Sequence, residues 1–254
     1  MHRFISYLLR PVTPLLLSAL LLTGQGAWAQ NISTSEPHFV SGPDSLRALL
    51  GRVQQQASPE LRGQLFLKLD LNKDGVPSKA SYVLPASAAE LALARNKEAQ
   101  ASTQKLLSQL PPWQLGTDPN NTAAPTVILP LTFGPATAPL PLLYSDDKPV
   151  FPFTSTSRVS RGAATTTPLD YIQRNFRYPA EDLRNGVQGT VYLYYEVSET
   201  GAIEQRRVVG SLSPSTDAEA LRSLRSLPNA TTPPRHQGRP VRVAYIAPIN
   251  LSIR

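Results

Sequence analysis

The chain has 254 residues, a formal net charge of +7 and 41% hydrophobic residues, which is enough apolar material for folded cores. It contains no cysteine, which excludes disulfides, thiol nucleophiles and every cysteine-based metal site. The charge is uneven: residues 30–154 are neutral, whereas residues 155–254 hold thirteen Arg and no Lys against eight acidic residues. The second half therefore carries either a solvated basic face or a surface that meets anions. Nucleic acid is not an expected partner, because no recognisable binding motif accompanies the charge.

The first 29 residues have the features of a secretory signal peptide. Arg3 and Arg10 supply a basic region, residues 15–22 form a short apolar run, and residues 27–29 fit a cleavage site. Cleavage would leave Gln30 as the first residue of an exported protein. The alternative is an uncleaved anchor in the inner membrane, and membrane contact would then be confined to this segment.

Hydrophobic periodicity predicts a first α+β unit over residues 44–134, after a loose leader at residues 30–43. Leu46, Leu49, Leu50 and Val53 lie on one face of a helix over 44–56. Residues 65–71 alternate as a strand with one buried face, and residues 72–75 form its turn. A return strand over 80–84, a single helix over 87–110 and a closing strand over 126–133 complete the unit.

Residues 135–167 read as a linker. The segment is rich in Pro, Ser and Thr, a composition that resists folding and favours extended conformations.

A second α+β unit is expected over residues 168–254. A short helix begins at Thr167-Pro168, one more helical turn covers 180–185, and a hairpin pairs 189–198 with 202–209. Thr216 and Glu219 have the spacing of a capping box that opens the next helix. The last strand, over 241–253, contains Pro248, which favours a position at the edge of the sheet.

The two units echo each other. Residues 63–75 and 189–201 both read as a strand that begins with Gly and a turn that ends with Gly. Each copy is followed by a Leu-rich helix ending in Leu-Pro and by a final apolar run with a Pro inside it. We therefore expect two copies of one small unit, each with two helices packed on a three-stranded antiparallel sheet.

The second unit resembles the C-terminal domain of TonB-family energy transducers. The features that carry the resemblance occur in the family's order: Tyr178-Pro179, Gly189-Thr190-Val191, Gly201-Ala202-Ile203, Ala220-Leu221, Leu227-Pro228, Gly238 to Val241, and Pro248-Ile249. The first unit is a fainter match that lacks the Tyr-Pro motif but keeps Leu110-Pro111-Pro112-Trp113, where the family often has an aromatic residue. The second unit has Asn229 at that place, a departure expected to loosen its packing.

The resemblance implies a periplasmic protein that contacts TonB-dependent outer-membrane transporters. The transporter's extended N-terminal segment would add as a strand to the last strand, in support of energy-dependent transmembrane transport. Carried over, the partner-binding residues are Arg177, Tyr178, Pro179, Arg242, Val243, Ala244, Tyr245, Ile246, Ala247 and Ile249. The first unit would be a spacer, a second binding site or a dimerisation surface, and an exposed edge also permits a homodimer.

Other functions receive less support from the sequence. No nucleophile elbow, phosphate loop or metalloprotease helix is present, so no catalytic residue, cofactor or metal is expected. Asp70 to Gly75 matches half of a calcium loop, but the twelfth position is Ser81 rather than an acid, which favours a hairpin turn. The alternatives are an anchored energy transducer and an envelope adaptor that binds anionic polymers through its basic face. Tyr192 and Tyr194 share one face of their strand, where they either pack internally or offer an aromatic surface.

Overall fold

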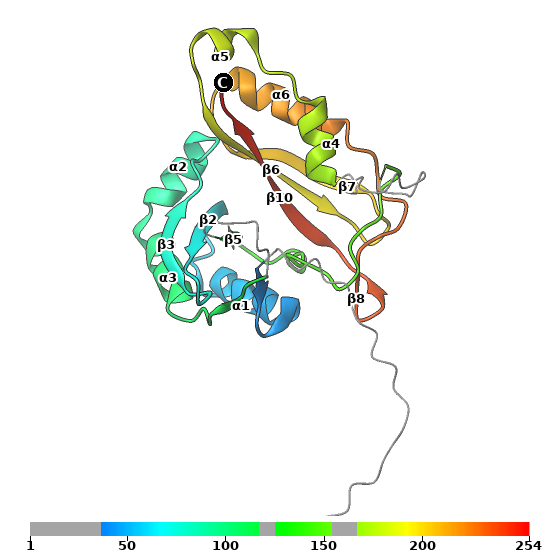
Figure 1. Ribbon diagram of the computed structural model, residues 1–254. Coiled ribbons are helices and arrows are strands. Elements are labelled where there is room, and N and C mark those ends of the chain that lie inside the picture. The colour runs from blue at the N-terminus through cyan, green and yellow to red at the C-terminus, as the bar shows by residue number, and fades with distance from the viewer. Residues whose placement is uncertain (1–36, 117–124, 154–166, 254) are drawn as a thin grey trace, which may run out of the picture. The chain divides into compact units, whose positions relative to one another are not determined.

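The computed structural model describes residues 37–116, 125–153 and 167–253 (Figure 1). The described residues belong to one compact unit. The predicted signal peptide, residues 1–29, lies outside the described residues, as does part of the predicted linker. Among the helices of the described ranges, none is both long and apolar enough to cross a membrane.

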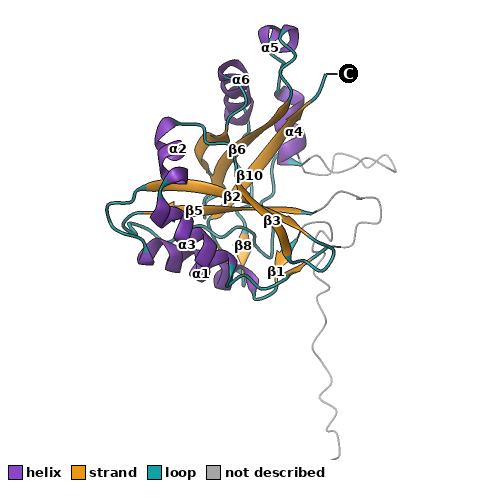
Figure 2. Cartoon of the chain, turned by 90° about the vertical axis from the view of Figure 1, so that its left-hand side faces the viewer, coloured by secondary structure: helices purple, strands orange, loops and turns teal. Residues whose placement is uncertain are grey.

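The first half is a three-stranded antiparallel sheet in the order β3-β2-β5, with helices on one face (Figure 2). Its elements are β1 (His38–Phe39), α1 (Gly42–Gln56), β2 (Gly63–Leu71), β3 (Pro77–Tyr82), α2 (Ala88–Arg95), α3 (Lys97–Leu107), β4 (Trp113–Gln114) and β5 (Thr126–Phe133). The odd-numbered leucines of β2 pack against the apolar stripe of α1 and against β5. This core accounts for the strict alternation in the sequence.

The second half repeats that arrangement, with the strand order β10-β6-β7. Its elements are α4 (Pro168–Asn175), α5 (Ala180–Arg184), β6 (Gly189–Val197), β7 (Ile203–Gly210), α6 (Pro214–Arg225), β8 (Arg235–His236), β9 (Arg239–Pro240) and β10 (Val243–Leu251). Val191, Leu193 and Tyr195 of β6 face α4 and α6 and form one core with them. In both halves the first long strand is central and the last strand lies at an edge.

The faces of the two sheets that carry no helices pack against each other. Phe66 and Val83 of the first half form a buried cluster with Tyr194, Val209 and Ala244 of the second half. Phe66 and Tyr194 meet edge to face with ring centroids 5.6 Å apart. The Arg207 guanidinium lies over both rings, 5.5 Å and 4.9 Å from their centroids. Both faces of each sheet are therefore covered, and Tyr194 serves internal packing.

Residues 140–153, which lie within the described part of the predicted linker, are held against both halves. Leu140, Leu143 and Tyr144 pack on the first core, whereas Phe151 is buried in the second. Backbone hydrogen bonds also join Asp147 to Arg235 and Val150 to Thr232. The segment forms isolated bridges but no helix or longer strand, and its apolar side chains give it fixed contacts. We call residues 140–153 the strap.

Several local expectations differ from the structure. The helix expected over 87–110 is two helices, because the Asn96 side chain accepts hydrogen bonds from Glu98 N and Ala99 N and begins α3 there. The leader is not loose as far as residue 43, since Phe39 is buried against Trp113. The cap of α6 is Ser213, which accepts from Thr216 N. The predicted cap Thr216 lies inside the helix instead.

The expectation that Asn229 loosens the second half was wrong. The Asn229 Oδ1 atom accepts a hydrogen bond from Ile203 N at 3.0 Å and so fixes the start of β7. The true counterpart of Trp113 is Ala230, because Trp113 N donates to Gly75 O and Ala230 N donates to Gly201 O. Both glycines have positive φ, and a Cβ on either would collide with the chain that donates to it.

The close approach of the two sheets generates a stability prediction at Gly210. A Cβ there would overlap Val83 and Tyr192, so Gly210→Ala should lower the free energy of unfolding by about 1–3 kcal/mol. Gly51→Ala is the matched control, because it lies inside α1 with nothing within 4 Å of the added carbon. It should be neutral or stabilise by up to about 1 kcal/mol. Urea unfolding measures both, and equal effects would contradict this account of sheet contact.

Candidate functional site: the edges of the second sheet

The two edges of the second sheet differ in regularity. The β6–β7 pairing shifts register twice, between Tyr192 and Leu193 and between Tyr194 and Glu196. Gln205 of β7 has φ of 53°, an unusual value for a residue other than Gly. Such bulges twist an edge strand and disrupt its row of backbone groups. The β7 edge is therefore a poor template for another strand.

The opposite edge, β10, is regular. Its antiparallel pairing with β6 runs from Val243 to Leu251 without a register shift. Ala244 N donates to Leu142 O outside the sheet, so the even-numbered residues of β10 point their backbone groups away from β6. Pro248 is one of them, which explains how a strand with a proline keeps an unbroken ladder.

The strap covers only the beginning of this edge. Leu142 makes a parallel bridge to β10, in which Leu142 N donates to Arg242 O at 3.0 Å and Ala244 N donates to Leu142 O at 2.8 Å. Beyond that bridge, no described residue forms a hydrogen bond with the outward backbone groups of Ile246 or Asn250. We call the outward backbone from Ala244 O to Asn250 the open edge.

The side chains of β10 are used inside the protein. Val243 is fully buried, Ala247 and Ile249 pack in the core under the helices, and Tyr245 stacks on Tyr195. Ala244 and Ile246 face the other way, into the cluster between the sheets. The open edge therefore offers its backbone rather than its apolar side chains.

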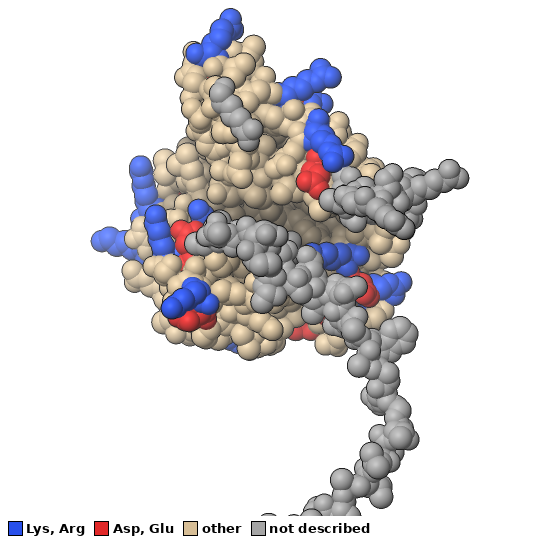
Figure 3. Space-filling view, in the orientation of Figure 1, with Lys and Arg blue, Asp and Glu red and all other residues tan. Residues whose placement is uncertain are grey.

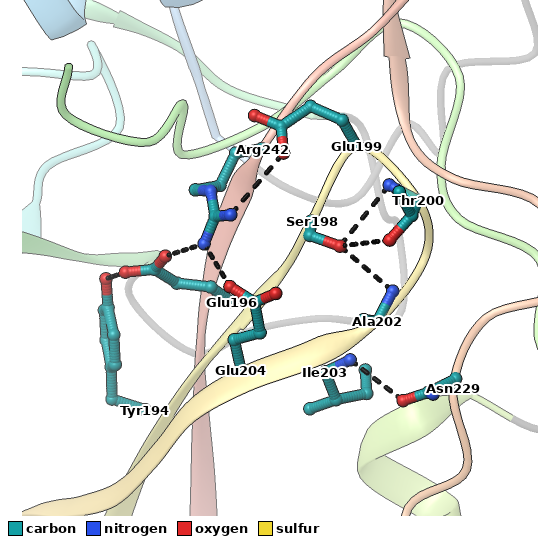
Figure 4. A network of polar contacts seen from close by, with 10 residues as sticks. All are labelled: Tyr194, Glu196, Ser198, Glu199, Thr200, Ala202, Ile203, Glu204, Asn229 and Arg242. Carbon is teal, nitrogen blue, oxygen red and sulfur yellow. Dashed lines mark hydrogen bonds and ion pairs between the residues drawn. The ribbon is translucent and has the colours of Figure 1, made fainter. Parts of the chain in front are cut away.

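Arg242, predicted to contact a partner, lies in an internal ion network (Figure 4). Its guanidinium is 2.5 Å from Glu204, 3.1 Å from Glu196 and 3.5 Å from Glu199. Hydrogen bonds from Arg242 to Glu204 and Glu196 raise the pKa of the guanidinium above its ordinary value. Tyr194 donates to Glu196, and burial together with this carboxylate raises the pKa of the Tyr194 hydroxyl. The network ties the β6–β7 hairpin to the start of β10.

The Tyr-Pro motif lies toward the other end of β10. The Tyr178 hydroxyl donates to Val187 O, just before Gly189, which pairs with Leu251. Arg177 N donates to Glu219 of α6, and Pro179 is the N-cap of α5. The sequence-predicted residues thus come from two elements, and the Tyr-Pro motif lies near the Leu251 end of β10.

Asp182, which the sequence does not single out, joins α5 to the beginning of α6. Its buried carboxylate accepts hydrogen bonds from Ser213, Ser215 and Thr216 at 2.6–2.7 Å. These hydroxyl donors, Thr216 first, hold the pKa of Asp182 below its ordinary value. The nearest signal in the sequence is an acid among polar residues, which is too common to be diagnostic.

On the face that Figure 3 draws, the basic side chains do not gather into one patch. Figure 3 shows Lys and Arg side chains standing singly around the face in view, several of them beside acidic residues. Arg222, for example, forms an ion pair with Glu219 at 2.6 Å. Within the described ranges, no group of three His, Asp or Glu side chains is placed to hold a metal ion.

Residues 174–253 match the family model for the C-terminal domain of the Gram-negative bacterial TonB protein. This part of the chain is a TonB-family C-terminal domain. The NMR structure of the TonB C-terminal domain from Helicobacter pylori is similar, with 19% identity and a TM-score of 0.30. That match covers 39% of this chain and 98% of the other. No curated protein matches the sequence.

TonB-family C-terminal domains are non-enzymatic interaction domains of proteins that couple energy to transporters, and they are periplasmic in Gram-negative bacteria. In the TonB-like domain described here, β10 is the last strand and lies at a sheet edge. The match begins within α4, so it includes neither the strap nor the first half.

The ion network generates a prediction at Arg242. Arg242→Met should lower the free energy of unfolding by about 1–3 kcal/mol, because it leaves Glu196 and Glu204 without their shared donor. Glu199→Gln is the control, since that carboxylate is half exposed and more distant, and it should change stability by less than about 0.5 kcal/mol. Thermal unfolding distinguishes the two. A larger loss from the Glu199 variant would contradict the proposed network.

Asp182 generates a pH prediction. A carboxyl whose folded pKa is depressed stabilises the fold above its unfolded pKa of about 3.9, and that contribution is lost as pH falls through the folded value. Asp182→Asn should therefore lower the melting temperature at pH 7 and flatten its decline below about pH 4. Melting curves from pH 7 to pH 2 test this. An unchanged acid slope would assign the acid sensitivity to other groups.

Proposed function

We propose that this protein binds the extended N-terminal segment of TonB-dependent outer-membrane transporters by strand addition to the open edge of β10. Binding would take place in the periplasm and serve energy-dependent transport across the outer membrane. The observation that carries the proposal is a regular edge strand, in a TonB-family domain, whose outward backbone beyond Ala244 has no described partner.

The chemistry of such an edge suits a guest strand. Ile246 and Asn250 each present an amide and a carbonyl, and an extended peptide can satisfy both. Backbone pairing accepts many sequences, so selection would come from side chains at alternate positions of the guest. Hydrogen bonds along one strand also share a load applied parallel to it, which suits a protein through which force is passed.

We further propose that the first half, residues 44–134, is a divergent duplicate of residues 168–254. Both halves place the first long strand at the centre of the sheet. In both, the carbonyl of the glycine in the hairpin turn accepts a hydrogen bond from the chain segment that follows the helix. Its sheet covers the helix-free face of the second sheet. In this proposal the first half is a permanent cover for the TonB-like domain.

Neither of the two alternative functions predicted from the sequence, an envelope adaptor or an anchored energy transducer, is supported by a comparable observation. An envelope adaptor that binds anionic polymers would favour a concentrated basic patch, whereas the visible cations are dispersed (Figure 3). An anchored transducer depends on residues 1–29, which lie outside the described residues. Sequencing the N-terminus of the exported protein decides that question, because a chain that starts at Gln30 has lost this segment.

The proposal predicts a loss of guest binding in Ile246→Pro. The substitution removes an outward amide and leaves the β6–β10 ladder intact, because Ile246 points its backbone away from β6. Affinity of the full chain for synthetic N-terminal transporter segments should fall about tenfold or more by fluorescence anisotropy.

Ile246→Ala is the matched control, since it trims the same half-buried side chain but keeps the amide. It should stay within about threefold of the unmodified chain. Equal losses in the two variants would assign the effect to packing and refute strand addition. Salt-sensitive binding to envelope fractions that survives Ile246→Pro would instead support the adaptor.

A further inference from the structure

A proline lies at the middle of the open edge. Pro248 falls between Ile246 and Asn250 among the outward positions of β10, and it pairs with Tyr192 across the sheet. Because proline has no backbone N–H, the edge presents a carbonyl at this point and no donor. The neighbouring ladder is unaffected, since Ala247 and Ile249 face β6 in unbroken register.

The corresponding strand of the first half has the same device. Pro130 pairs with Phe66 in β5, which is also the last strand and also lies at an edge. Leu71 N donates to Pro125 O, so the odd-numbered residues of β5 face β2 and Pro130 faces outward. Each strand thus points its missing donor away from its sheet, where proline does not weaken the ladder, but Pro130 is buried whereas Pro248 is partly exposed.

A missing donor affects self-pairing more than pairing with a foreign strand. A regular edge is a template for any strand, including the same edge of a second copy. When two β10 strands pair so that both prolines lie within the ladder, each proline leaves a carbonyl of the other strand without its hydrogen bond. When a guest strand without proline pairs with β10, only the guest carbonyl opposite Pro248 lacks its hydrogen bond.

The strap sets a second limit on what can bind. Leu142 is fully buried and makes two backbone hydrogen bonds to Arg242 and Ala244. Further hydrogen bonds fix the same segment at Asp147 and Val150. A guest therefore meets a fixed boundary at Ala244 and can pair only from there to Asn250.

We infer that Pro248 makes the open edge selective: it admits a short extended segment of another protein, bounded by Leu142, and rejects a second copy of this chain. The inference rests on the proposed function for its guest, whereas the rejection of a second copy follows from the edge alone. Pro248 is then a specificity-determining residue whose loss strengthens both kinds of pairing, self-pairing more.

The test is Pro248→Ala in the full chain, which restores one outward amide without touching the ladder. The double variant Pro248→Ala/Asn250→Pro is the matched control, because it moves the missing donor to the next outward position. Sedimentation equilibrium measures self-association, and anisotropy with the transporter peptides measures guest binding. Circular dichroism verifies that each variant is folded.

We expect Pro248→Ala to bind the peptides about two- to tenfold more tightly and to self-associate at least about tenfold more strongly than the unmodified chain. The double variant should return toward the unmodified chain in both measurements. Pro130→Ala should leave peptide affinity unchanged, because it lies on the other sheet.

Two results would overturn the inference. One is a folded Pro248→Ala variant that self-associates no more than the unmodified chain; the other is equal self-association of the single and double variants. Failure of the unmodified chain to bind any transporter peptide would refute the proposed function instead. Sedimentation of Pro248→Ala would still decide whether the proline rejects a second copy.

Discussion

The fold depends on one constraint: each three-stranded sheet carries apolar side chains on both of its faces. In β2 the odd-numbered leucines face the helices while Phe66 faces the other way, and in β6 Leu193 and Tyr194 divide in the same manner. Helices can cover only one of these faces. The other face is covered by the sheet of the other half, so each sheet buries the helix-free face of its neighbour.

The contact between the sheets also bears on the function. It buries Tyr194 and Val209 on the helix-free face of the second sheet and leaves Tyr192 half-buried, so these side chains do not form an open peptide-binding surface. What remains for a partner is an edge. Of the two edges of the TonB-like domain, bulges disrupt β7, whereas β10 keeps a regular register. The backbone chemistry of the proposed site is thus a consequence of how the two halves are packed.

Much of the fold could be predicted from local pattern. The alternation in β2, the position of β5 and the edge position of Pro248 all follow from period-2 spacing and from the missing amide of proline. The break at Asn96 was missed because an Ala-rich run hides a cap that acts through one side chain. The strap was missed for a different reason: its contacts are made by a few apolar residues in a Pro-rich segment, and their partners lie far away in sequence. Arg242 was expected to contact a partner because strand position alone cannot show that Glu196 and Glu204 already surround it.

The strap has a consequence for where this protein can be cut. The homologous region starts at residue 174, inside α4, but Phe151 lies in the same core as α4 and Leu142 occupies the first part of the β10 edge. A piece excised at the family boundary would lose both of these residues and bare the aromatic face of β6. The region that matches the family is therefore smaller than the packed unit, which extends back through the strap into the first half.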